Sequence, residues 1–174
     1  MRRVFYAFGT LLFALVLFVF LGISNSDAQK YDTALPKIRS IPAPAFEMPD
    51  ELASYTNNGV LFLNADAEYV RAPLVLPHKA RLQKVEMVCK DNNAAGSIRM
   101  WLHVYSNDLS ESFTLCLVES TGASDTYRTF STTTISPNKI FNDNYNYFLN
   151  LRLPGTKADG YEFVAAKIHF KGGK

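Results

Sequence analysis

The sequence predicts an all-β protein, an antiparallel β-sandwich of about eight strands. From about residue 55 onward, short runs rich in β-branched and aromatic residues recur at regular intervals, and each run is closed by Asn, Asp, Gly or Pro. No stretch of this region keeps helical spacing of apolar residues over three turns. Regular strands without helices between them favour an antiparallel sandwich over a parallel α/β sheet.

The chain opens with a stretch typical of a secretory signal peptide. Arg2 and Arg3 precede an almost uninterrupted apolar run at 4–23, and Ser26 and Ala28 are the small residues that a signal peptidase accepts before its cleavage point. The run is about 20 residues long, so an uncleaved membrane anchor stays open as the alternative. Both interpretations predict that the rest of the chain is secreted or periplasmic. If the signal peptide is cleaved after residue 28, the mature chain is no longer attached to the membrane.

Residues 29–54 are expected to form an extended spacer. This segment contains Pro36, Pro42, Pro44 and Pro49 and shows no hydrophobic period. Proline fixes the backbone φ angle and lacks the N–H that a strand ladder or helix needs. The alternative is that part of the segment lies over the folded body as an ordered arm, through residues such as Ile41 and Phe46.

The folded body, residues 55–174, is expected to be a single domain. Its eight predicted strands are 59–64, 68–76, 81–90, 97–106, 112–119, 127–134, 145–153 and 161–170. Alternation assigns their faces. In the last strand it assigns Val164, Ala166, Ile168 and Phe170 to the core, and Phe163, Ala165, Lys167 and His169 to the outer face.

Several segments of this body resemble a group of uncharacterised secreted bacterial proteins. They are 69–80 (YVRAPLVLPHKA), 82–85, 91–93, 135–137, 144–149 and 161–170. The resemblance covers most of residues 58–171 and consists of turn and strand patterns. It implies a compact, jelly-roll-like sandwich, which agrees with a count of eight strands, and it implies no assigned activity.

Charge argues against nucleic acid as a partner. Without residues 1–28 the chain has 16 basic and 15 acidic residues, and the basic residues are scattered singly among the acids. Binding of nucleic acid or of an anionic membrane requires a clustered basic surface.

The two cysteines, Cys89 and Cys116, leave the question of a disulfide open. Export permits a disulfide, and an even count favours one. However, Cys116 alternates out of step with Phe113, Leu115 and Leu117, so it faces away from the core if those three face inward. Two unpaired, packed thiols are therefore the alternative.

The pattern indicates no catalytic, metal or cofactor site. The three histidines, His78, His103 and His169, lie apart, and no Gly-x-Ser-x-Gly elbow accompanies them. Glu86, Glu119 and Glu162 lie in or at the ends of strands, and nothing links any two of them as a glycosidase pair. The turns 91–93 and 142–144 offer oxygen ligands for Ca²⁺, but Asx-rich turns also form for backbone reasons alone.

An aromatic row is the strongest candidate for a binding site. Trp101, His103 and Tyr105 share one phase of a strand whose other phase carries Met100, Leu102 and Val104, which we assign to the core. An exposed row of this kind suits a protein interface or the stacking of sugar rings. The alternative is that both faces of the strand are covered.

We therefore expect an exported, non-catalytic binding or structural β-sandwich, at the cell surface or in the periplasm, that binds a protein partner or itself. The second hypothesis is a carbohydrate-binding module acting through the aromatic row. A small secreted hydrolase is the third.

Overall fold

The computed structural model describes residues 36–47, 53–55, 59–64 and 68–173. The predicted signal peptide, with its anchor alternative, lies outside these residues. Within the described ranges the strands are β1 (Lys37–Pro42), β2 (Ala53–Tyr55), β3 (Leu61–Leu63), β4 (Glu68–Leu74), β5 (Arg81–Asp91), β6 (Arg99–Ser106), β7 (Ser112–Glu119), β8 (Ser124–Thr132), β9 (Tyr145–Leu153) and β10 (Tyr161–Lys171). In this part of the chain no helix is long and apolar enough to cross a bilayer.

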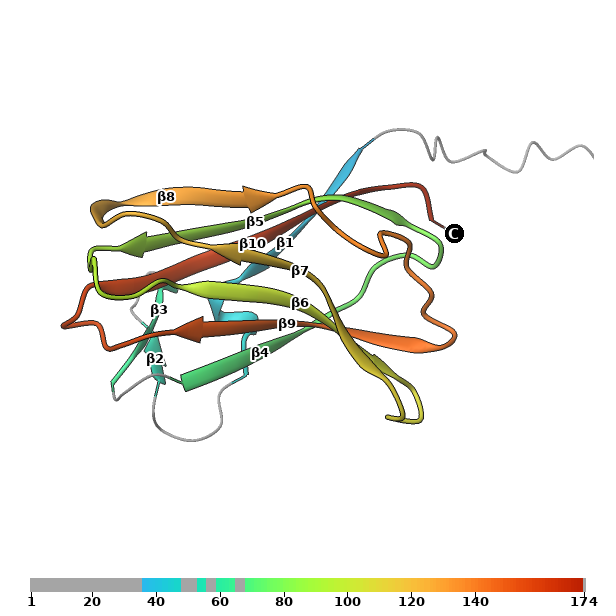
Figure 1. Ribbon diagram of the computed structural model, residues 1–174, viewed down its shortest axis with the longest axis horizontal. Helices are drawn as coiled ribbons and strands as arrows, with labels where there is room; N and C mark the ends of the chain where they lie inside the picture. The colour runs from blue at the N-terminus through green and yellow to red at the C-terminus, as the bar shows by residue number, and fades with distance from the viewer. Residues whose placement is uncertain (1–35, 48–52, 56–58, 65–67, 174) are drawn as a thin grey trace, which may run out of the picture. The chain divides into compact units, whose positions relative to one another are not determined.

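The strands form two antiparallel sheets, and the predicted β-sandwich is confirmed (Figure 1). Sheet A has the order β2-β3-β10-β5-β8, and β1 also pairs with β10. Sheet B has the order β4-β9-β6-β7. Each of the eight predicted strands is present, with ends that differ by a few residues.

The core lies between the two sheets and follows the period-two pattern of the strands. Val85 and Met87 of sheet A are fully buried, and so are Leu102, Leu149 and Leu151 of sheet B. Burial of such side chains stabilises the fold by about 1.5–3 kcal/mol each relative to exposure. Alternation alone therefore assigned most inward positions correctly.

The segment before the sandwich contributes a strand and three core side chains. Within the predicted spacer, β1 pairs with β10 from Lys37, opposite Phe170, to Pro42, opposite Ala165. A 3-10 turn, η1 (Ala43–Ala45), follows it. Ile41, Ala43 and Phe46 are buried, and the Phe46 ring meets Phe163 edge-on at a centroid distance of 4.9 Å. Residues 37–47 thus have the form of the ordered arm, and a strand that ends on a proline is compatible with a sheet edge.

Two irregularities in strand pairing change the inward and outward phase. The register of β10 on β5 shifts between Phe163 and Ala165, so that Val164 is an extra residue in the ladder. Phe163, predicted to face outward, is instead fully buried, while Val164 is only partly buried. A bulge places two consecutive residues against one partner residue and thereby interrupts the alternation.

The second irregularity affects Cys116. Leu102 pairs with Cys116 and His103 with Thr114, which leaves Leu115 as the extra residue. Leu115 and Cys116 are consequently both buried, whereas Leu117 is 39% exposed. The condition that Phe113, Leu115 and Leu117 all face the core is therefore not met, because the alternation is reset within β7.

Both thiols lie in the core as free cysteines. Cys89 and Cys116 are unpaired and buried. Burial raises the pKa of the Cys89 thiol to about 12 and that of Cys116 to about 11. Of the two alternatives that the sequence left open, the structure has the unpaired, packed thiols.

Candidate functional site

The aromatic row of β6 lies on the outer side of sheet B, as the alternation predicts. Met100, Leu102 and Val104 are fully buried on the inner side. Trp101, His103 and Tyr105 alternate with them and keep partial exposure. The alternative of a strand covered on both faces therefore does not describe β6 in this structure.

Strand pairing adds residues of β9 and β4 to this surface. Asn150 of β9 lies between Trp101 on β6 and Arg71 on β4, and Phe148 pairs with His103. Arg152 pairs with Tyr69 of β4 and with Arg99 of β6. We call this surface the aromatic face and define it as Tyr69, Arg71, Trp101, His103, Tyr105, Phe148, Asn150 and Arg152.

The rings of the aromatic face form two groups. In one, Tyr69 and Trp101 lie 5.9 Å apart between centroids, with planes inclined by 36°. In the other, the Tyr105 ring lies 4.9 Å from His103 and 5.8 Å from Phe148. These separations are those of packed aromatic pairs, which hold one another in fixed orientations.

Guanidinium groups cover and connect the rings. The guanidinium of Arg71 lies 5.6 Å from the Tyr105 ring centroid and 5.4 Å from that of Phe148. Its Nε donates a hydrogen bond to Asn150 Oδ1 at 3.1 Å. The guanidinium of Arg152 lies 6.0 Å from the Tyr69 ring centroid. Both groups are within the range of a cation–π contact, so each ring group is paired with a cation.

His103 is held in its neutral form on this face. Burial lowers the pKa of its imidazole, and the positive charge of Arg71 lowers it further. Its Nδ1 forms a hydrogen bond with Thr114 Oγ1 at 3.0 Å. A neutral imidazole has one donor and one acceptor nitrogen, so His103 adds a polar group to the surface without adding charge near pH 7.

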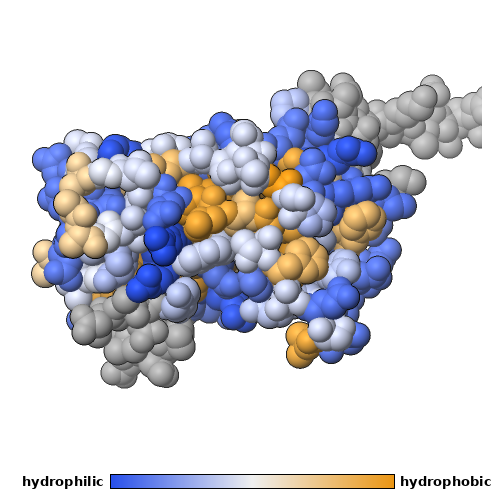
Figure 2. Space-filling model, in the orientation of Figure 1, coloured by the Kyte–Doolittle hydropathy of each residue, from blue (hydrophilic) through white to orange (hydrophobic). Residues whose placement is uncertain are grey.

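The surface over sheet B combines apolar and polar areas. Figure 2 shows hydrophobic colour gathered near the middle of the view, over β6 and β7, with hydrophilic residues around it. Leu117 pairs with Trp101 and is 39% exposed, and Tyr69 is 56% exposed. The apolar area is therefore small and interrupted by arginine, asparagine and threonine side chains.

A pocket adjoins the aromatic face where β4 ends and β9 begins. Its volume is about 250 Å³, and its lining is Pro73, Leu74, Val75, Asn142, Tyr145, Asn146, Tyr147 and Phe148. Phe148 belongs to both the pocket and the aromatic face, so the two are continuous. Val75 on its rim is well exposed.

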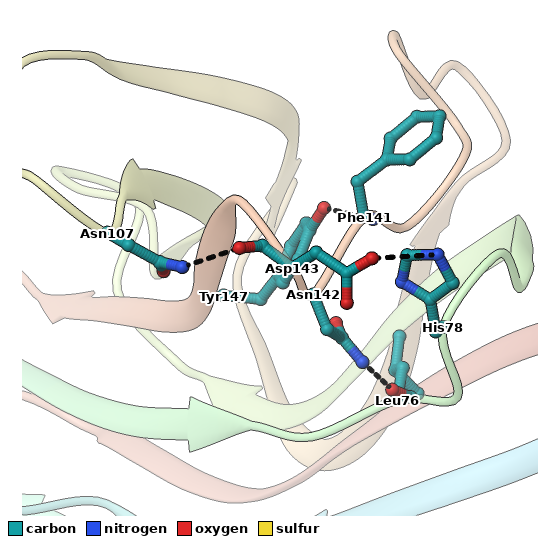
Figure 3. Close-up of polar contacts among 7 residues, drawn as sticks. All are labelled: Leu76, His78, Asn107, Phe141, Asn142, Asp143 and Tyr147. Carbon is teal, nitrogen blue, oxygen red and sulfur yellow. Dashed lines mark hydrogen bonds and ion pairs between the residues drawn. The ribbon is translucent and has the colours of Figure 1, made fainter.

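The loop 142–144, one of the two calcium candidates, is tied to its neighbours by its own polar groups (Figure 3). Asn142 Nδ2 donates to the Leu76 carbonyl at 2.6 Å, and Asn107 Nδ2 donates to the Asp143 carbonyl at 2.9 Å. The Asp143 carboxylate lies 3.5 Å from His78 Nε2. These contacts fix the loop against residues 76–78 and 107, which accounts for its Asx-rich composition.

The other calcium candidate, 91–93, is also used internally. The buried Asp91 carboxylate accepts a hydrogen bond from Ser120 Oγ, which in turn accepts one from the Ile98 N–H at 2.8 Å. The second carboxylate oxygen accepts from Asn93 N at 3.3 Å. Among the described residues no group of three or more His, Cys, Asp or Glu side chains is placed to hold a metal ion.

The three strand glutamates serve as ion-pair partners. Glu86 lies 2.5 Å from Lys84 Nζ, Glu119 lies 2.8 Å from Arg99 Nε, and Glu162 lies 2.9 Å from Lys90 Nζ. Hydrogen bonds from Lys84 and Arg99 are the largest influences on Glu86 and Glu119 and lower the pKa of both carboxyl groups. Burial is the largest influence on Glu162 and raises its pKa, but hydrogen bonds from Tyr127 and Lys90 together bring it below its ordinary value. A glycosidase needs one carboxyl group whose pKa is raised, which is the opposite shift.

Sequence reasoning found the β6 row but missed its partners. Tyr69, Arg71, Phe148 and Arg152 lie on the outer phases of β4 and β9, a signal that is visible in the alternation of those strands. Their contact with Trp101 and Tyr105 depends on β9 pairing with both β4 and β6, which are far apart in the chain. That strand order is a tertiary property and has no local sequence pattern.

No protein-family model matches the sequence, and a search of curated proteins finds no matching sequence. Among solved structures, the chain is similar to the CBM36-1 domain of a multidomain xylanase from the hindgut metagenome of Trinervitermes trinervoides, with 11% identity, 79% of this chain and 99% of that chain covered, and a TM-score of 0.49. A carbohydrate-binding module CBM36 in complex with calcium and xylotriose gives 14% identity, 75% and 98% coverage, and a TM-score of 0.47.

A third solved structure, CsCBM6-3 from Clostridium stercorarium in complex with cellobiose, gives 15% identity, 78% and 93% coverage, and a TM-score of 0.42. At this level of similarity the function of the chain has to be inferred from its own side chains.

Proposed function

We propose that the protein is a non-catalytic, exported β-sandwich that binds carbohydrate on the aromatic face. The observation that carries the proposal is the alternation of rings with hydrogen-bonding groups across β4, β9 and β6. Trp101 of β6 and Tyr69 of β4 lie on opposite sides of Asn150 and Arg152 of β9, and the Arg71 guanidinium lies against the Tyr105 and Phe148 rings.

Sugar chemistry fits this arrangement. A pyranose ring has apolar faces of C–H groups and an edge of hydroxyl groups, so it needs a flat aromatic surface beside donors and acceptors. Trp101 and Tyr69 supply the rings, and the amide of Asn150 and the guanidinium of Arg71 supply polar groups in the same plane of the sheet. The packing of the rings against one another fixes them before a ligand arrives, which reduces the entropy lost on binding.

A protein interface is the weaker candidate for the same surface. Trp, Tyr and Arg are also enriched at protein interfaces, so the residue types of the aromatic face alone suit both candidates. The exposed apolar side chain beside Trp101 is Leu117, and the apolar area is small and interrupted by hydrogen-bonding groups. A stable protein interface covers about 800 Å² on each partner, so a small, hydrated ligand is the better match.

The test is binding of the exported protein to a panel of soluble polysaccharides, measured by affinity electrophoresis and titration calorimetry. We expect Trp101→Ala to weaken binding by about tenfold or more, because a buried aromatic anchor contributes at least about 1.4 kcal/mol to a binding site. Thermal unfolding should change little. Tyr127→Ala, which removes an exposed tyrosine of sheet A together with its hydrogen bond to Glu162, is the control for binding and should bind normally.

Light scattering separates the two candidates. If the wild type binds no polysaccharide, and Trp101→Ala instead lowers its molar mass in solution, the aromatic face is a protein interface. If both proteins are monomeric and neither binds any polysaccharide, the proposed function is wrong.

A further inference from the structure

We propose that the aromatic face selects acidic glycans, and that Arg71 and Arg152 bind the carboxylate groups of uronic acid residues. This inference rests on the proposed function and names the ligand class of the same site. It depends on the charge of the face rather than on its rings, so it can fail while carbohydrate binding stands.

No ion pair neutralises the two arginines of the aromatic face within the described residues. Arg71 and Arg152 form no ion pair there, and their contacts are with rings and with the Asn150 amide. Their neighbour Arg99, in contrast, is paired with Glu119. On the outer side of sheet A, Lys84 and Lys90 also have carboxylate partners.

Strand register concentrates this charge. Arg152 lies directly opposite Arg99, and Arg71 lies opposite Asn150, which is two residues before Arg152 on the same face of β9. Like charges opposite each other in a sheet are destabilising, and diagonal neighbours are within reach of long side chains. Glu119 neutralises one of these three guanidinium groups. An anionic ligand would offset the remaining repulsion.

Arg71 is positioned to bind a carboxylate. Its Nε is hydrogen-bonded to Asn150, and its plane is fixed near the Tyr105 and Phe148 rings, so the terminal nitrogens are the donors that a ligand would meet. A guanidinium offers a planar fork that matches a carboxylate. Because the side chain is already held in place, little further conformational freedom is lost on binding.

One carboxylate lies near this site. Glu47, at the end of the N-terminal arm, exchanges two backbone hydrogen bonds with Arg71, at 2.6 and 3.1 Å. Opposite residues of an antiparallel bridge lie on the same face, yet Glu47 and Arg71 form no ion pair in the structure. Glu47 should therefore repel an acidic glycan, and Glu47→Gln should strengthen binding of that ligand and leave neutral ligands unaffected.

The experiment compares polygalacturonate, alginate and glucuronoxylan, each beside its carboxyl-reduced neutral form, by titration calorimetry with the exported protein. We expect at least one acidic polymer to bind roughly tenfold more tightly than its reduced form, because charge-assisted hydrogen bonds are about twice as strong as neutral ones. The difference should shrink as salt is raised, since exposed charges are screened.

Variants of the two arginines test whether they cause the preference for acidic polymers. Arg71→Gln combined with Arg152→Gln should remove the preference, so that the acidic and the reduced polymer bind equally, and both should bind more weakly than to the wild type because Arg71 also contacts neutral sugars in the proposed site. Arg128→Gln, which removes an arginine stacked on the Phe130 ring of sheet A, is the matched control and should keep the preference. Circular dichroism verifies that each variant is folded.

The outcomes are distinguishable. Equal binding of acidic and reduced polymers overturns the proposed acid selectivity and leaves the carbohydrate-binding function in place. Preference for the acidic form that persists in the double variant assigns the carboxylate site elsewhere and also overturns it. Absence of binding to every polymer overturns the proposed function itself.

Discussion

The outer faces of the two sheets use charged residues in opposite ways. On sheet A, Glu86 accepts contacts from Lys84 and His169, and Glu162 accepts contacts from Lys90 and Tyr127. On sheet B, Arg71 and Arg152 lie over aromatic rings and form no ion pair among the described residues. The first arrangement satisfies its charges within the chain, whereas the second leaves donors and rings available to a ligand.

This difference separates the side chains that stabilise the fold from those that we propose to bind a ligand. A hydrogen bond to a charged group contributes about 1.5–3 kcal/mol when partly buried, so the networks of sheet A belong to the folded state. The partly exposed rings and arginines of sheet B contribute less to folding because they keep contact with water. Residues of sheet A and of the shared core should therefore affect stability, and residues of the aromatic face should affect binding.

The largest contrast is expected within β6 itself. Leu102→Ala should lower the free energy of unfolding by about 2–5 kcal/mol, because it removes a fully buried side chain and leaves a cavity. Trp101→Ala, one residue away on the outer side, should lower it by about 1 kcal/mol or less. Urea unfolding measures both values. Similar losses in the two variants would contradict the division of β6 into a core side and a binding side.

A smaller effect is expected on sheet A from Glu162→Gln. At neutral pH this change should cost about 1–3 kcal/mol, because Lys90 and Tyr127 lose an ionised partner. Although burial raises the pKa of Glu162, hydrogen bonds from Tyr127 and Lys90 bring it below its ordinary value of 4.5. A lowered pKa in the folded state stabilises the protein above the unfolded-state pKa, and this contribution is lost as the pH falls through the folded-state value.

The difference in stability between wild type and Glu162→Gln should accordingly be constant above about pH 5.5 and shrink below the ordinary pKa of 4.5. Urea unfolding at a series of pH values measures it. Arg71→Gln on sheet B is the comparison and should show no such pH dependence, since Arg71 has no carboxylate partner in the described structure. If the difference in the free energy of unfolding between wild type and Glu162→Gln instead increases on acidification, Glu162 is not ionised in the folded protein.

The smallest effect is expected for the two cysteines of the core between the sheets, whose thiols should be unreactive in the folded protein. Cys89 and Cys116 should not react with a thiol reagent at pH 8 in the folded protein, because both are buried and have raised pKa values. In denaturant without reductant, both should react. Labelling that requires prior reduction would show a disulfide after export and would contradict the free thiols of the structure.

Sequence periodicity was sufficient for the fold class and for most strands, because a strand with one buried face must alternate. It was insufficient at Phe163 and Leu117, where a local irregularity in pairing resets the phase. It was also insufficient for β1, since Pro36 and Pro42 weaken the strand signal although an edge strand tolerates proline at its ends.

Only the part of the candidate site that lies on a single strand, β6, was predicted from the sequence. Trp101, His103 and Tyr105 share one strand, and their common phase follows from local geometry. Arg71 and Arg152 join them through the order β4-β9-β6, in which strands far apart in the sequence become neighbours. The proposed charge selectivity therefore depends on the order of strands in the sheet and cannot be inferred from any one segment of the chain.

The N-terminal arm connects both sheets to whatever precedes residue 36. β1 is paired with β10 of sheet A over six consecutive residues, and Glu47 is bonded to Arg71 of sheet B. If the aromatic face holds a ligand, as we propose, a pull from the N-terminal side acts first on β1 and on its ladder with β10. The β1–β10 ladder then resists as one unit if the pull lies along the strands, and it opens pair by pair if the pull lifts β1 away from the sheet edge.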